Sequence, residues 1–372
     1  MAWNYVATFT GTWSIANLPA GAVDKSNTLW VMYGDEGQNS ALTYFSEPIP
    51  HDGKLSPVDP TRLSQRTADS PCLVPVHGQL VTLWSSITDQ KLLWGVLDAK
   101  TKSLSEHSLS STRAGALAAF FPETDCLFTA FRGDTPSQSF RGNFPLLYCD
   151  VIGPDTPQPQ TRTPMDFSAS APNAPGLYDA YYSPAVAAMP AGAASPGGEI
   201  AVLWKGIGSP GAESSDNELY FVSAPDPLKP VFPGTGLLRY PGPGGAPTTA
   251  TTMNRPSLAL HGTGKTPATL VAVYSGTATG SSYKASGQLR YLVGTLTRSG
   301  VTWAAPLPNG TVPLGALLAN AAPGGGAVTL TNPVGVWVTA PTPSNTLYLL
   351  VGDQVDGRIK GPLYVVRYMG EL

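Results

Sequence analysis

The residues best suited to chemistry stand in the connections that lead into short strands of small residues. They are three arginines, two aspartates, two asparagines and two tyrosines: Arg66, Asp69, Arg113, Tyr178, Asp179, Tyr182, Asn254, Arg255 and Asn332. Arginine binds carboxylate or sulfate groups, whereas aspartate beside tyrosine suits sugar hydroxyls or acid–base catalysis. We therefore take Asp69, Asp179 and Tyr182 as candidate catalytic groups and the other six residues as candidate ligand-binding groups.

The elements that must position these residues recur six times along the chain. The units have a strand of the form L-x-x-x-aromatic and then one of the form L-x-aromatic, as in Leu80–Trp84 and Leu92–Trp94. The fourth unit begins with isoleucine instead, at Ile200–Trp204, and the elements of the last unit, Leu347–Val351 and Leu363–Val365, end in valine. A small-residue strand precedes five of the units, and a weaker fourth strand completes each one. One such unit cannot bury its apolar face alone, so neighbouring units must stack on one another.

Four-stranded antiparallel units arranged radially form a β-propeller, which leaves only short strand edges. The sequence therefore predicts an all-β fold: one six-bladed β-propeller spanning residues 1–372. The predicted blades are roughly residues 10–60, 61–112, 113–165, 178–240, 250–305 and 325–372. Residues 3–9 are expected to close the ring as the outer strand of the last blade. The connections that carry the candidate residues should reach closest to the axis.

Composition excludes several classes of partner. Glycine and proline are abundant, at 40 and 37 of 372 residues, as expected for many turns between short strands. Only 13% of residues are charged and the net charge is −3, so we expect neither nucleic acid nor a membrane surface as a partner. The chain starts without a visible secretion signal, which predicts a cytoplasmic protein or one exported by a non-classical route. Its oligomeric state stays open.

No motif for a metal or cofactor is apparent. The three cysteines, Cys72, Cys126 and Cys149, lack the spacing of metal ligands. His77 and His261 fall in predicted hairpin turns on the rim opposite the candidate residues. The glycine-rich stretches precede no helix, so they do not indicate a phosphate-binding loop. We expect neither a metal nor a cofactor.

The repeat resembles those of lectin-type β-propellers from fungi and bacteria. Its clearest instance combines Ser183–Val186 with Ile200–Gly206 and Leu219–Phe221. The resemblance covers nearly the whole chain and implies a six-bladed propeller that binds sugars at its rim or between its blades. Here the core leucines and aromatic residues repeat but the loops do not, which favours one site near the axis over several equivalent sites.

Three classes of function stay open. The first is a lectin-like protein that binds a small polar ligand, in particular a glycan. The second is an enzyme with a single axial active site, such as a hydrolase, a lyase or a cyclising isomerase; the arginines, aspartates and Tyr182 echo the residue set of sialidases, whose sequence boxes are missing. The third is a scaffold that binds a protein over the rim.

Overall fold

Antiparallel β-sheet makes up nearly all of the regular structure in the computed structural model. The structure describes residues 3–49, 54–89, 91–110, 116–121, 126–131, 145–150, 158–164, 184–189, 198–205, 217–225, 236–261, 269–277, 285–297, 300–305, 310–322, 326–339 and 346–370. The described helices are the single turns η1 (Glu36–Gln38), η2 (Pro243–Gly245) and α1 (Leu314–Leu317). In these ranges no helix is long and apolar enough to cross a membrane.

The strands follow one another in chain order from sheet to sheet. The first sheet contains β2 (Ile15–Val23), β3 (Thr28–Asp35), β4 (Ala41–Pro48) and β6 (Thr61–Arg66). The second contains β7 (Cys72–Val76), β8 (Gln79–Ser85), β9 (Leu92–Asp98), β10 (Ser103–Leu104) and β11 (His107–Ser110). Next come β12 (Ala116–Phe121), β13 (Cys126–Phe131), β14 (Pro145–Asp150) and β15 (Gln158–Pro164), followed by β16 (Ala185–Met189), β17 (Glu199–Lys205), β18 (Leu219–Pro225) and β19 (Gly236–Leu237).

The C-terminal part of the chain repeats the same order. Its strands are β22 (Ser257–His261), β23 (Thr269–Thr277), β24 (Ala285–Thr297) and β25 (Gly300–Ala304), and then β26 (Pro333–Thr339), β27 (Leu347–Val355), β28 (Arg358–Ile359) and β29 (Leu363–Tyr368). The recurrent sequence elements are confirmed as paired strands, because Leu83 of β8 lies opposite Trp94 of β9 and Leu203 of β17 lies opposite Phe221 of β18.

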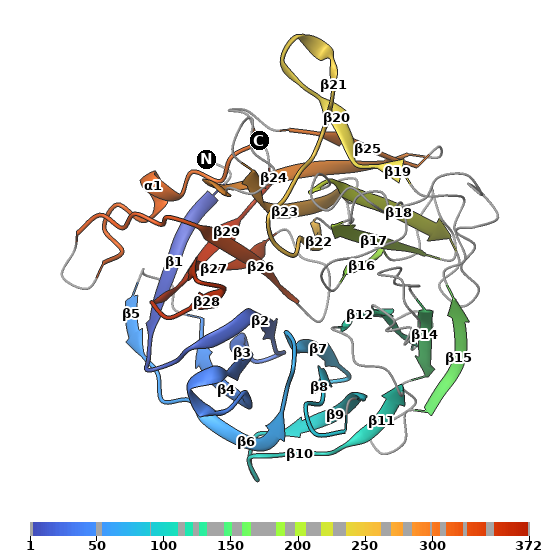
Figure 1. Cartoon of the computed structure of the whole chain (residues 1–372), viewed down its shortest axis with the longest axis vertical. Coiled ribbons are helices and arrows are strands. Elements are labelled where there is room, and N and C mark those ends of the chain that lie inside the picture. Colours follow the sequence, from blue (N-terminus) through green and yellow to red (C-terminus); the bar gives the residue numbers. More distant parts are fainter. Residues whose placement is uncertain are drawn as a thin grey trace.

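The innermost strands form a closed ring. Each of β2, β7, β12, β16, β22 and β26 contacts the next, and the ring closes where β2 pairs in parallel with β26. Figure 1 shows these strands around the centre, with the other strands of each sheet farther out. Small residues permit this crowding: a Cβ atom on Gly21 would lie 2.9 Å from side-chain carbons of Leu350 and Val338. The fold is thus all-β and propeller-like.

The apolar core lies between neighbouring sheets. One cluster of buried residues joins the last sheet to the first and includes Phe9, Val31 and Val336. Another joins the first sheet to the second. Two further clusters pack the sheet of β17 against that of β23, and the sheet of β23 against that of β27. The recurrent aromatic residues Tyr33, Trp84 and Trp204 are all buried. Stacking of the repeated units therefore supplies the core, as the sequence pattern predicts.

The N-terminal strand β1 (Trp3–Thr10) pairs antiparallel with β29, with Trp3 opposite Tyr368. Two expectations about the first unit need correction. Strand β6 pairs with β4, so the first sheet runs beyond residue 60 to Arg66. Strand β5 (Lys54–Pro57) pairs in parallel with β1, so this part of the predicted first blade belongs to the last sheet. The polar sequence of residues 54–66 does not indicate that β5 pairs with β1 or that β6 pairs with β4.

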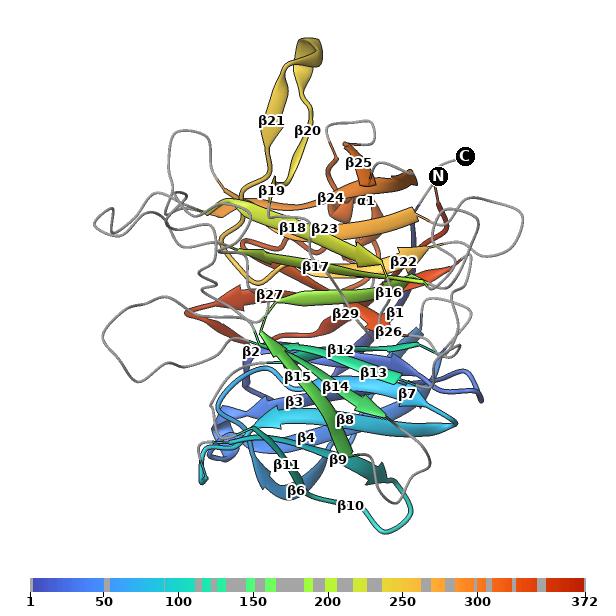
Figure 2. The ribbon, with the colours of Figure 1, turned by 90° about the vertical axis from the view of Figure 1, so that its right-hand side faces the viewer.

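A two-stranded hairpin projects from the ring. It consists of β20 (Arg239–Pro241) and β21 (Pro247–Thr249), and both views show it extending away from the sheets (Figures 1 and 2). Its tip holds η2, where Gly244 and Gly245 have φ angles of 75° and 81°. Glycine adopts such angles without steric cost, which explains the glycine-rich sequence at this turn. These glycines therefore connect the two paired strands at the tip of the hairpin.

Candidate functional site

The connections into β7 and β22 share one local geometry. The hydroxyl of Thr67 donates to the carbonyl of Asp69 at 2.7 Å, and that of Thr252 donates to the carbonyl of Asn254 at 2.9 Å. In both cases a proline follows Ser70 or Arg255 and restricts the residue before it to extended backbone. We call these two connections, residues 67–71 and 252–256, the entry turns of β7 and β22.

Backbone bonds attach each entry turn to the second strand of the sheet that it enters. Ala68 N–H donates to the carbonyl of Ser85 at 2.7 Å, and Met253 N–H donates to the carbonyl of Ser275 at 3.1 Å. The Ser275 hydroxyl in turn donates to the carbonyl of Pro333 at 2.7 Å, at the start of β26. Ser275 therefore joins the entry turn of β22 to the start of the next inner strand, and the polar residues there sit on rigid backbone.

Arg255 is the most unusual residue of these turns. The residue is 6% exposed, and its Nε and Nη1 atoms have no hydrogen-bond partner among the described residues. Burial lowers the pKa of Arg255 below its ordinary value, and the charges of nearby Asp69 and Cys72 act in the opposite direction. The guanidinium stays charged at neutral pH, because arginine is not deprotonated in proteins. A buried charge with two unpaired nitrogens is expensive, since their desolvation is not offset.

The partners of Arg255 locate it at the middle of the ring. Arg255 precedes β22, whereas Asp69 and Cys72 stand at the start of β7. In the ring of inner strands β7 contacts β2 and β12, and β22 contacts β16 and β26, so β7 and β22 are not neighbours. The electrostatic interaction of Arg255 with Asp69 and Cys72 thus crosses the ring, which brings together two predicted site residues, Arg255 and Asp69.

Two asparagines next to this position also have unused polar atoms. The amide Nδ2 of Asn254 and the amide Oδ1 of Asn332 are buried and have no hydrogen-bond partner in the described part of the chain. The other groups of Asn332 are engaged: its backbone N–H donates to Asp353 Oδ1 at 2.6 Å, and its Nδ2 donates to the carbonyl of Gln354 at 3.1 Å. These bonds define the orientation of the Asn332 amide and leave Oδ1 as the free acceptor.

The remaining predicted site residues have different outcomes. Arg66 is the last residue of β6, where it pairs with Ala41 and is exposed, so it is an outer-strand residue and not part of an entry turn. We placed Arg66 in the connection because the weak fourth strand is unreadable in the sequence. Arg113, Tyr178, Asp179 and Tyr182 lie outside the described residues.

Sequence reasoning missed Lys205 and Asn217 as site residues. Lys205 is 8% exposed, and its Nζ donates to the carbonyl of Met253 in the entry turn of β22 at 3.5 Å. Burial lowers the pKa of Lys205 to about 8. The carbonyl of Asn217 accepts a 2.6 Å bond from Thr252 N–H. A signal existed for Lys205: it directly follows Trp204, the aromatic residue that ends the recurrent strand, where Ser85 and Ser275 also contact an entry turn.

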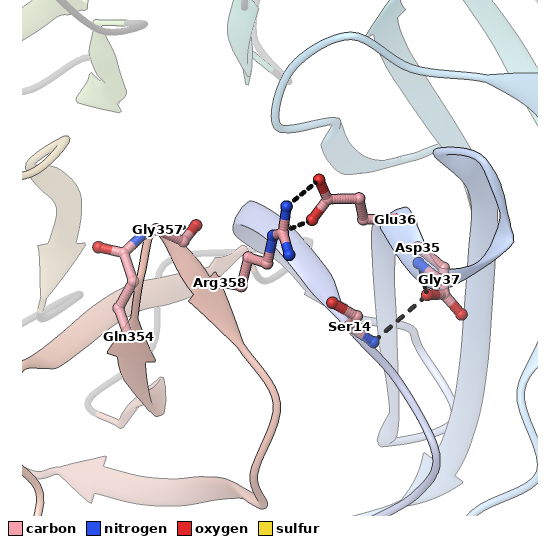
Figure 3. A network of polar contacts seen from close by, with 7 residues as sticks. All are labelled: Ser14, Asp35, Glu36, Gly37, Gln354, Gly357 and Arg358. Atoms are coloured by element: carbon pink, nitrogen blue, oxygen red, sulfur yellow. Dashed lines mark hydrogen bonds and ion pairs between the residues drawn. The ribbon is translucent and has the colours of Figure 1, made fainter.

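Charges of the first and last sheets meet at another part of the rim. The Arg358 guanidinium donates from Nη2 to Glu36 Oε1 at 2.7 Å, and its Nε contacts Oε2 of the same carboxylate (Figure 3). Beside this pair, Asp35 Oδ1 accepts from the N–H groups of Ser14 and Gly37 at 3.3 and 3.1 Å. These contacts join the rim loops of the first and last sheets. Among the described residues, no cluster of histidine, cysteine, aspartate and glutamate could hold a metal ion.

Comparisons with known proteins establish the fold. No protein-family model matches the chain, and no curated protein matches it by sequence. Solved structures of similar fold include the NanB sialidase from Streptococcus pneumoniae, with a TM-score of 0.54 and 8% identity over 97% of this chain and 69% of that chain. A protein of unknown function from Dyadobacter fermentans has a TM-score of 0.53 and 11% identity over 100% and 98% of the two chains. The Aleuria aurantia lectin, in complex with Fucalpha1-6GlcNAc, has a TM-score of 0.50 and 10% identity over 93% and 91%.

Proposed function

We propose that this chain is a six-bladed β-propeller, closed by its N-terminal strand, that binds a small polar ligand at one site on its axis. The ligand we propose is a carbohydrate. The observation that carries the proposal is the buried guanidinium of Arg255, whose Nε and Nη1 atoms have no partner among the described residues. A ligand that supplies oxygen acceptors at this position would satisfy these donors, and charge-assisted hydrogen bonds are among the strongest in proteins.

One site fits the structure better than several equivalent sites. The residue before the proline of the entry turn is Ser70 in the turn of β7 and Arg255 in the turn of β22. The Ser70 hydroxyl accepts from Leu18 N–H at 3.0 Å, so this residue serves to join neighbouring sheets. Nε and Nη1 of Arg255 have no such bond among the described residues. Of the two described entry turns, only that of β22 has side-chain donors without partners, those of Asn254 and Arg255, as an asymmetric axial site requires.

The carbohydrate class rests on the chemistry of the free groups. Arginine and asparagine donors with an asparagine acceptor match the alternating acceptors and donors of a polyhydroxylated molecule. The same fold occurs in a lectin in complex with Fucalpha1-6GlcNAc and in a sialidase, so it accommodates proteins named for sugar-related functions. An enzyme with one axial active site is the second candidate, and it is favoured by one feature: the Asp69 carboxylate lies near the Arg255 guanidinium.

A panel of monosaccharides titrated calorimetrically into the full chain tests this proposal. We expect one site per chain, lost in Arg255→Gln and retained in Arg62→Gln, which removes an exposed arginine of β6. Several equivalent sites, or sugar binding that Arg255→Gln leaves unchanged, would contradict the axial site. For the enzyme alternative, product release from glycosides should stop in Asp69→Asn while binding persists; binding without turnover would leave the lectin-like function.

A further inference from the structure

The described methionines differ widely in how far solvent reaches their sulfur atoms. Two of the six methionines of the chain lie outside the described residues. Met32 and Met189 are buried, at 0% and 2% exposed, and Met253 is half-buried. Met369, which directly follows β29, is 47% exposed. A thioether must be accessible to react with a peroxide, so Met369 is the described methionine that a peroxide meets first.

The backbone of Met369 is held in place although its side chain is exposed. The residue before it, Tyr368, is buried and lies opposite Trp3 where β1 pairs with β29 (Figure 1). The residue after it, Gly370, has a φ angle of 96°, and a Cβ atom there would lie 2.7 Å from Cε1 of His261. Contacts on both sides therefore define where the Met369 sulfur stands.

The neighbour of this sulfur belongs to the strand that pairs with β29 at the chain ends. Asn4 of β1 donates from Nδ2 to Met369 Sδ at 3.3 Å. Asn4 also has a fixed backbone, because it lies opposite Arg367 in the pairing of β1 with β29. A thioether sulfur is a weak acceptor, so this bond contributes little to the attachment of β1. An oxygen atom added to the same sulfur would give the Asn4 amide a polar acceptor.

We propose that Met369 is a site of oxidation by hydroperoxides and that Asn4 binds the product, so that oxidation tightens the attachment of β1 to β29. With hydrogen peroxide, the Sδ lone pair attacks one oxygen and the O–O bond breaks. The sulfur loses two electrons and keeps that oxygen as a sulfoxide, while the other oxygen leaves with both protons as water. Asn4 Nδ2 then donates to the sulfoxide oxygen. Neither residue belongs to the proposed axial site.

The exposure of Met369 explains why oxidation should strengthen this contact. A sulfoxide inside a core is disruptive, because it places a polar group among apolar side chains. The Met369 sulfur lies at the surface, where the added oxygen displaces solvent and not packed carbon atoms. Met253 is the contrasting case: Asn217 Nδ2 donates to its Sδ at 3.6 Å, but Met253 is half-buried and should react more slowly.

The experiment treats the full chain with hydrogen peroxide and follows each methionine by peptide mass spectrometry. We expect Met369 to be oxidised at least about tenfold faster than Met32 and Met189. Hydrogen exchange of the backbone amides of residues 3–10 then measures how firmly β1 is paired. Exchange should slow by about threefold on oxidation, because a better hydrogen bond stabilises the paired strand. Methionine sulfoxide reductase with dithiothreitol should restore the original rate.

Two variants assign the effect to this pair. Met369→Leu keeps the size of the side chain and cannot be oxidised, so peroxide should leave the exchange of residues 3–10 unchanged even where other methionines react. Asn4→Ala keeps the sulfur and removes the donor, so Met369 should still be oxidised without slower exchange.

The other outcomes would overturn the proposal. Oxidation of Met369 no faster than that of Met32 would remove the oxidation site, and this comparison needs no variant. Unchanged or faster exchange in the oxidised wild type would show that the sulfoxide does not strengthen the attachment of β1. Slowing of equal size in oxidised Asn4→Ala would show that Asn4 does not bind the sulfoxide.

Discussion

Arg255 and Asp69 interact across the ring of inner strands, although 185 positions separate them and their strands β22 and β7 are not neighbours. The relationship depends on the two entry turns, which Thr67 and Thr252 shape in the same way. A buried arginine normally has hydrogen-bonded partners, since desolvating its charge is costly. Here Nε and Nη1 of Arg255 have no hydrogen-bond partner among the described residues, so the burial of this side chain lowers the stability of the fold.

The first prediction concerns that loss of stability. Arg255→Met keeps most of the side-chain volume and removes the charge, so the free energy of unfolding should stay the same or rise by about 1–3 kcal/mol. Urea denaturation followed by tryptophan fluorescence measures this change. The same variant should fail to bind the axial ligand. A drop in stability of several kcal/mol would show instead that Arg255 has a structural role.

The second prediction concerns the pH dependence of stability at Lys205. Its pKa falls from 10.5 in the unfolded chain to about 8 in the folded one, because burial disfavours the charged amine. Between these values the unfolded state binds more protons, so stability should rise as pH increases from about 8 to 10.5. The total gain should be on the order of 3 kcal/mol.

Lys205→Met provides the matched comparison, because it cannot be charged. Its unfolding free energy should exceed that of the wild type at pH 7, and the rise attributable to Lys205 between pH 8 and 10.5 should disappear. Urea titrations at several pH values measure both effects. Identical pH profiles for the two proteins would mean that Lys205 titrates at its ordinary pKa.

The third prediction concerns the N-terminal strand. The Trp3 ring stacks on Trp337 with centroids 5.9 Å apart and lies 4.8 Å from Tyr368 of the last strand. Replacement of this buried residue by alanine should lower the free energy of unfolding by about 3–5 kcal/mol, because it leaves a large cavity. Asn4→Ala, on the same strand, serves as the control and should cost far less. Denaturant unfolding of both variants tests whether β1 holds the last sheet.

The fourth prediction concerns the ion pair between Arg358 and Glu36 on the rim. Their side chains are 44% and 35% exposed, so water and salt screen their attraction. A double-mutant cycle with Arg358→Gln and Glu36→Gln should give a coupling energy below about 1 kcal/mol. It should decrease further in high salt. A larger, salt-insensitive value would show that the pair anchors the first sheet to the last.

Much of the fold could be predicted from particular residues. Leucine and aromatic residues at fixed spacing identified the second and third strands of each sheet, because these positions fill the space between sheets and are constrained by packing. Small residues such as Ala185 and Ala187 marked an inner strand for the same reason, and both are buried. The fourth strands could not be read, since β6 and β5 lie at sheet edges where polar residues are tolerated. Arg66 was misplaced for this reason.

The sequence by itself determined that units repeat, that they must stack, and which residue types stand at the entry turns. It did so because burial of the same apolar face imposes the same local pattern on every unit. Only the tertiary structure decided that Arg255 meets Asp69, that Lys205 joins the same entry turn, and that Arg66 stays outside. These contacts depend on how strands that are distant in the chain are arranged around one ring. A local sequence pattern does not encode the distance between side chains on opposite sides of that ring.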